Sequence, residues 1–100
     1  MNDTRKIKLH RNSSEFKQLK NIVNDNAGAV QRNLLKDITE LKQLNTDLET
    51  IEKWTKKGWN IEARKRQLQE NISCYRYELW ILEIISFETI GEKYKKVKGC

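Results

Sequence analysis

The chain has 100 residues and a net charge of +6, with 37% apolar and 34% charged residues. A chain of this length makes at most one small domain, and the clustering of its apolar residues argues against wholesale disorder. Proline is absent and only four glycines occur, so the composition excludes a fold of many short strands and favours long helices.

Residues 1–12 are strongly basic, and we expect them to form a flexible arm. Arg5, Lys6, Lys8 and Arg11 can each contact a phosphate group, which makes the arm a candidate for nucleic-acid binding. Its alternation of apolar and basic residues also permits a strand that adds to a partner's sheet edge. A solvated basic terminus is the more common outcome for such a composition.

The first helix is expected at 14–24, with a cap at Asn12 or Ser13. Phe16 and Val23 belong to an apolar face that repeats at helical spacing. The following residues, "NDNAG", predict a turn. We therefore expect a short helix that folds back and braces two longer ones.

The second helix is expected at 29–57. Leu34, Leu41 and Leu48 are spaced by seven residues, and further apolar residues fill the second position of a heptad pattern. The pattern predicts a coiled-coil-like seam about three heptads long, with a charged and solvated opposite face.

A hairpin turn is predicted at "WTKKGWN". With Gly58 just beyond the helix, Trp54 and Trp59 occupy the two positions that make the hydrophobic contact of a Schellman cap. Asn60 then suits the N-cap of the next helix. The alternative is an exposed recognition tip, formed by the two tryptophans and the two lysines between them.

The third helix is expected at 61–98, and its seam follows a heptad-like spacing through Ile61, Leu68, Ile72, Tyr75, Leu79 and Leu82. Its second half carries a further apolar face, made by Tyr77, Trp80, Ile81, Ile84 and Phe87. One antiparallel neighbour cannot cover both faces, so we expect the second face to be a protein interface.

These elements together predict an all-α fold, with residues 13–100 as one helical domain. Its main feature is a long antiparallel hairpin, which the short bracing helix supports and which a second copy completes into a bundle. Folding the chain at Gly58 places Leu41 opposite Tyr75 and Leu34 opposite Leu82.

A helix-turn-helix is the alternative for residues 13–38, and it would present Gln31 and Arg32 near the start of a recognition helix. The continuation of the second helix into a long seam counts against this alternative. A nucleic-acid-binding transcriptional regulator is therefore our second choice.

Catalysis has little support in this sequence. The only histidine, His10, lies in the basic arm, and no spacing indicates a metal site, a cofactor site or a nucleophile. No run of about 18 uncharged apolar residues is present, so we expect a cytoplasmic protein that neither spans nor binds a membrane.

We expect a small, non-enzymatic module that docks on another protein as a regulator or inhibitor, and that forms a homodimer. The Lys-, Asn- and Ile-rich composition is typical of small proteins from low-GC bacteria and their phages, which favours a phage or prophage origin.

Overall fold

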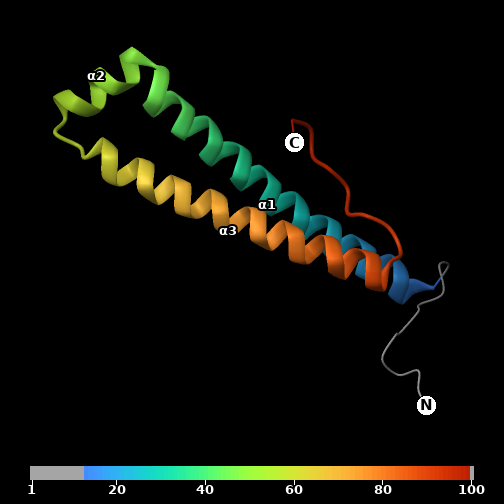
Figure 1. The fold of residues 1–100 in the computed structure, drawn as a ribbon. Helices are drawn as coiled ribbons and strands as arrows, with labels where there is room; N and C mark the ends of the chain where they lie inside the picture. The colour runs from blue at the N-terminus through green and yellow to red at the C-terminus, as the bar shows by residue number, and fades with distance from the viewer. Residues whose placement is uncertain (1–12, 100) are drawn as a thin grey trace.

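The computed structural model describes residues 13–99, and in this range it contains the helices α1 (Ser14–Thr46), α2 (Leu48–Lys56) and α3 (Ile61–Thr89). α1 and α3 run antiparallel and pack side by side, and α2 lies across the end that joins them (Figure 1). The molecule is elongated, with principal dimensions of 64 × 25 × 16 Å. The prediction of an all-α helical hairpin is confirmed.

The predicted break between residues 24 and 29 is wrong, because α1 continues through it as one helix. The Ser13 side chain caps the helix by accepting a hydrogen bond from the Phe16 N–H at 3.1 Å. Gly28 costs about 1 kcal/mol relative to alanine inside a helix. Ala27 and Gly28 are both buried, however, so tertiary packing outweighs the local turn signal. The separate bracing helix therefore does not exist.

The predicted helix at 29–57 is also interrupted, at Asp47. Asp47 has an extended backbone, with φ −89° and ψ 104°. Its carboxylate accepts hydrogen bonds from the Glu49 N–H at 3.3 Å and from the Thr50 hydroxyl at 2.7 Å. A short acidic side chain is a poor interior helix residue and a strong N-cap, which explains why α2 starts here.

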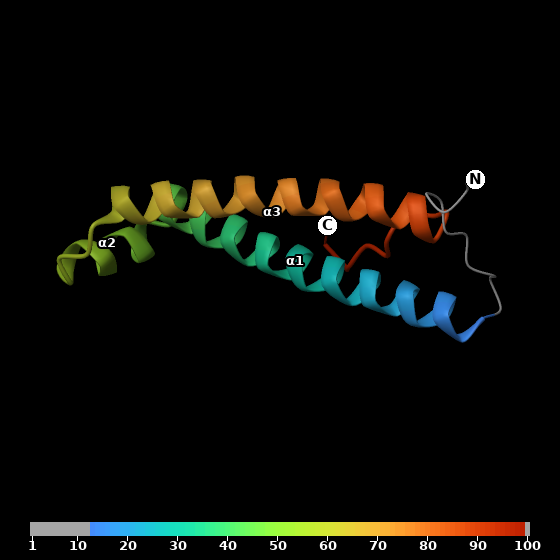
Figure 2. The same cartoon turned by 90° about the horizontal axis from the view of Figure 1, so that it is seen from below.

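The interruption shifts the pairing between the long helices. Arg64 of α3 pairs with Glu40 of α1, and Asn71 pairs with Asp37, so α3 lies about two to three helical turns from the predicted register. Figure 2 shows the cause, since α2 is set obliquely across the end of the hairpin and does not extend α1. The register therefore begins near Thr46 and Ile61 rather than at the turn.

The predicted end of the third helix at residue 98 is wrong as well. α3 ends at Thr89, and Gly91 follows with a left-handed φ of +83°. The N–H groups of Ile90 and Gly91 both donate to the Ser86 carbonyl, at 2.8 and 3.1 Å. Residues 90–99 then return alongside α1 as a non-helical tail.

Two clusters hold the hairpin together. Near the open end, Ile90 is buried against Phe16 and Val23. Towards α2, Leu44 and Leu68 are almost completely buried. Burial of side chains of this size contributes about 1.5–3 kcal/mol each, which makes the seam the main source of stability.

A bidentate ion pair joins α1 and α3 close to α2. Arg64 Nε and Nη2 donate to the two carboxylate oxygens of Glu40, at 2.6 and 2.8 Å. This hydrogen bonding lowers the pKa of the Glu40 carboxyl below its usual 4.5 and raises the pKa of Arg64. The pair is partly exposed, so it fixes the register more than it adds to stability.

Candidate protein interface

The most prominent surface feature is an apolar ridge on α3, which we call the outer ridge and define as Tyr77, Trp80, Ile84 and Phe87. These residues follow each other at steps of three, four and three, so they share one helix face. That face points away from α1, because the opposite positions of α3 form the buried seam. The exposed fractions of the four side chains lie between 44% and 60%. The predicted second apolar face is therefore open to solvent in the single chain.

The ridge continues sideways towards α1. Ile81 is half-buried and lines a shallow groove of about 370 Å³ with Leu82 and Glu78. The other wall of the groove comes from α1, through Ala29 and Val30 with Asn26. All five residues predicted for the interface thus lie on one connected surface.

The ridge has internal order before any partner binds. The rings of Tyr77 and Trp80 lie 5.8 Å apart between centroids and are tilted by 45°. Rings that already contact each other lose less side-chain freedom on binding than isolated rings do, which favours their use as an anchor. Acidic side chains flank the ridge, with Glu78 and Glu88 exposed, and Arg76 adds one exposed positive charge. These charges can orient a partner without interrupting the apolar surface.

The hairpin turn adopts the geometry of a Schellman cap. The Trp59 N–H donates to the Trp54 carbonyl and the Gly58 N–H donates to the Thr55 carbonyl, both at 3.1 Å. The two indole rings meet edge to face at 5.0 Å, and Gly58 has φ +70°. Asn60 Oδ1 accepts from the Ala63 N–H at 3.0 Å and caps α3. The tryptophans therefore have a structural role in closing the turn.

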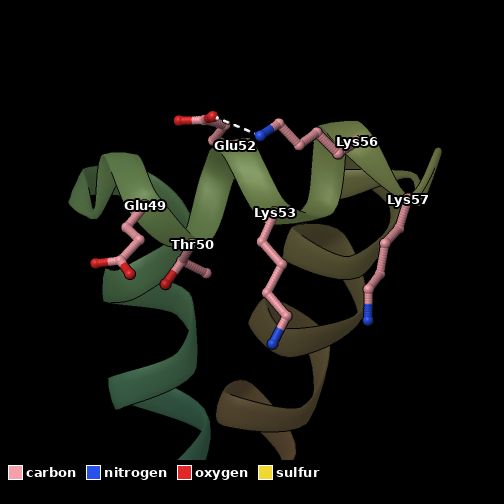
Figure 3. A pocket seen from close by; sticks show the side chains of 6 residues that line it. All are labelled: Glu49, Thr50, Glu52, Lys53, Lys56 and Lys57. Atoms are coloured by element: carbon pink, nitrogen blue, oxygen red, sulfur yellow. Dashed lines mark ion pairs between the residues drawn. The ribbon is translucent and has the colours of Figure 1, made fainter.

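Beside the turn lies an open hollow of about 540 Å³ along α2 (Figure 3). Lys53 and Lys57 extend towards the same side of α2, whereas Lys56 points outward and pairs with Glu52 at 3.0 Å. Lys57 also lies 4.6 Å from the centre of the Trp59 ring. The hollow mixes carboxylate and ammonium groups, so its chemistry favours no single class of ligand. The recognition-tip alternative stays a prediction.

The residues proposed for nucleic-acid contact do not come together in the structure. Gln31 is only 1% exposed and bonds to the tail, so it cannot read a base edge. Arg32 is exposed on α1. The helix-turn-helix at 13–38 is wrong, because this segment forms one uninterrupted helix. Four further candidates lie outside the described residues, namely Arg5, Lys6, Lys8 and Arg11.

Within residues 13–99, no group of three or more His, Cys, Asp or Glu side chains could hold a metal ion. None of the helices in this range is long and apolar enough to cross a membrane. The chain was compared with protein-family models, curated proteins and solved structures, and nothing matched it. The surface itself must therefore carry any functional argument.

The sequence analysis missed the tail and its anchor on α1. Gly91 was the available signal, because a glycine often follows the last residue of a helix. Gln31 lies between the buried positions Ala27 and Leu34 on the same side of α1, and such a polar residue within an apolar stripe indicates a specific hydrogen-bond partner.

Proposed function

We propose that the protein is a non-enzymatic helical interaction module that docks on another protein through the outer ridge and thereby regulates or inhibits it. One observation carries this proposal: the ridge is exposed while the opposite face of α3 is buried. Its three half-exposed rings present roughly 300 Å² of apolar surface, a size at which surface patches are often functional.

The proposal includes a homodimer in the absence of the partner. Ile84 and the neighbouring Ile85, which is 40% exposed, widen the apolar surface beyond the aromatic rings. A second copy presents the same surface, and a closed two-fold pairing of α3 with α3 would bury both ridges at once. Composition alone supports the further proposals of a cytoplasmic setting and a phage or prophage origin.

The self-pairing is tested by the molar mass of the purified protein, measured by light scattering over a range of concentrations. The double substitution Trp80→Ala with Ile84→Ala removes the centre of the ridge and should give a monomer where the wild type is a dimer. Leu48→Ala is the matched control, because Leu48 is 80% exposed on α2, away from the ridge. A wild-type monomer at every concentration, or a dimer that survives the double substitution, contradicts the pairing.

Partner docking needs a separate measurement. Proteins captured by the tagged wild type and lost with the double variant should be purified, and their binding remeasured by calorimetry. We expect a loss of at least tenfold in affinity for the double variant, since central aromatic anchors commonly contribute 2 kcal/mol or more. Equal binding by wild type and variant would remove the ridge as the docking surface.

The alternative of a nucleic-acid-binding regulator now depends on the basic arm, because the helix-turn-helix does not form. Binding to heterologous duplex DNA, measured by fluorescence anisotropy, separates the two functions. A nucleic-acid binder should lose affinity steeply with salt and on removal of residues 1–11. Binding that responds to Trp80→Ala and not to loss of the arm would favour protein docking.

A further inference from the structure

The tail forms a strap along α1, which we define as residues 92–99. Asn24 Oδ1 accepts a hydrogen bond from the Lys95 N–H at 2.7 Å. Gln31 Nε2 donates to the Lys95 carbonyl at 3.0 Å, and Gln31 Oε1 accepts from the Val97 N–H at 3.1 Å. Two side chains of α1 therefore bind three consecutive main-chain groups on one edge of the strap.

This pattern resembles the hydrogen bonding of a neighbouring β-strand. In an extended chain, the N–H and C=O of one residue and the N–H of the second residue after it point to the same side. The amide of Gln31 has a donor and an acceptor in the geometry of a peptide group, so it can bind two of them at once. α1 thus recognises an extended backbone and not a particular set of side chains.

Two side chains of the strap add apolar contacts. Tyr94 packs against the cluster of Phe16, Val23 and Ile90. Val97 lies over Gly28, where an added Cβ would be 3.7 Å from the Val97 Cγ1. The basic side chains at 93, 95, 96 and 98 are exposed. The face therefore accepts an extended segment with apolar residues three positions apart and places few demands on the others.

A permanently attached tail would not require this arrangement. An apolar residue at position 31 would hold a tail without burying an amide, and a buried amide is costly unless it is hydrogen-bonded. Gln31 also donates to the Ala27 carbonyl of its own helix, at 3.1 Å, which holds the amide in place. A preorganised main-chain receptor is the kind of site at which one extended segment can replace another.

We infer that this face of α1 is a docking site for an extended segment of a partner protein, with apolar residues three positions apart, and that the strap is a built-in competitor for it. The strap leaves its site by rotation about the Gly91 region while the hairpin core stays folded. A tethered strap has a millimolar effective concentration, so it blocks weak segments and yields to better ones. The site is on α1 and does not depend on the outer ridge.

The test uses the full-length chain with Lys95→Pro and Val97→Pro, which removes both N–H groups that the strap donates. A synthetic peptide of residues 91–99, GEKYKKVKG, is then added in trans. Calorimetry gives its affinity, and the NMR signals of the Gln31 side-chain amide report the place of binding. We expect saturable binding that shifts these signals, and binding at least tenfold weaker to the wild type, whose own strap competes.

A matched peptide carries an N-methyl group at the position of Val97 and keeps the charge and every side chain. Its affinity should fall roughly three- to tenfold, the share of one hydrogen bond. Equal affinity of the two peptides would mean attraction by charge alone and would overturn the inference. Absence of binding to the proline variant, with circular dichroism showing intact helices, would overturn it too.

A second measurement needs no substitution in the strap. In the wild type, the amide hydrogens of Lys95 and Val97 should exchange at least tenfold faster than those of the buried seam, because the strap opens locally. Exchange as slow as that of Leu68 would mean a permanently fixed tail and would overturn the inference. Peptide binding should be unchanged by Trp80→Ala, so failure here is distinguishable from failure of the proposed ridge function.

Discussion

Gly58 gives the sharpest test of how the hairpin is closed. A Cβ added there would meet nothing within 4 Å, so crowding does not contribute to the effect of Gly58→Ala. The only cost is backbone strain, because φ is +70° and the left-handed region costs an ordinary residue about 1–2 kcal/mol. We expect a loss of about 1–2 kcal/mol in the free energy of unfolding, which corresponds to a melting temperature lower by roughly 4–8 °C per kcal/mol.

Urea unfolding followed by far-ultraviolet circular dichroism measures this loss, at one fixed protein concentration so that any self-association contributes equally. Gly58→Asn should be milder, since asparagine tolerates the left-handed region. Gly28→Ala should have the opposite sign and gain up to about 1 kcal/mol, because Gly28 is inside a helix. Its new Cβ would meet the far end of the exposed Arg32 side chain at 3.2 Å, and that side chain can move. A neutral Gly58→Ala would refute the reasoning.

Three further substitutions test the polar contacts of the hairpin. Because the Arg64 hydrogen bonds lower the folded pKa of Glu40, their contribution is present above the unfolded value of about 4.5 and is lost as pH falls through the folded value. Urea unfolding at several pH values should therefore show Glu40→Gln less stable than wild type by about 1 kcal/mol or less near neutrality, with no difference in strong acid. Asp37→Ala should cost about 1–3 kcal/mol, because the Asn71 amide, 3.2 Å from the Asp37 carboxylate, loses its acceptor in the seam; a further change of Asn71→Leu should restore part of this in thermal unfolding. Asn60→Ala should cost about 0.5–2 kcal/mol through the lost cap of α3, and Asn60→Ser should cost little, by the same assay.

The sequence was informative wherever local chemistry and tertiary packing agreed. The turn around Gly58 has a glycine, a cap and two aromatic rings at positions that support the same geometry. The apolar face at Trp80 could be predicted because its residues exceed what one neighbouring helix can cover. Both features depend on residues close together in the chain, and local patterns describe these best.

The errors arose where a local signal met a distant contact. "NDNAG" favours a turn locally, but the buried positions Ala27 and Gly28 pack within the fold and keep α1 helical. At Asp47 the opposite happened, since a heptad pattern continued through a residue that works better as a cap. One unpredicted break then moved the whole pairing of α1 with α3, because register depends on where each helix begins.

Polar residues within the apolar stripes explain what the hydrophobic pattern could not. Asp37 in the seam bonds Asn71 and so fixes the register of the hairpin, while Gln31 bonds the strap and fixes its path. Each buried polar group is costly unless its partner is in place, so each one selects a single arrangement. The outer ridge has an aromatic pair and isoleucines at its centre, which supply affinity with little directional preference. The face beneath the strap has the reverse character, since its hydrogen bonds specify direction and backbone position but bury little surface. A partner that engaged both would obtain its affinity from α3 and its orientation from α1, which gives a chain of this size two separate means of recognition.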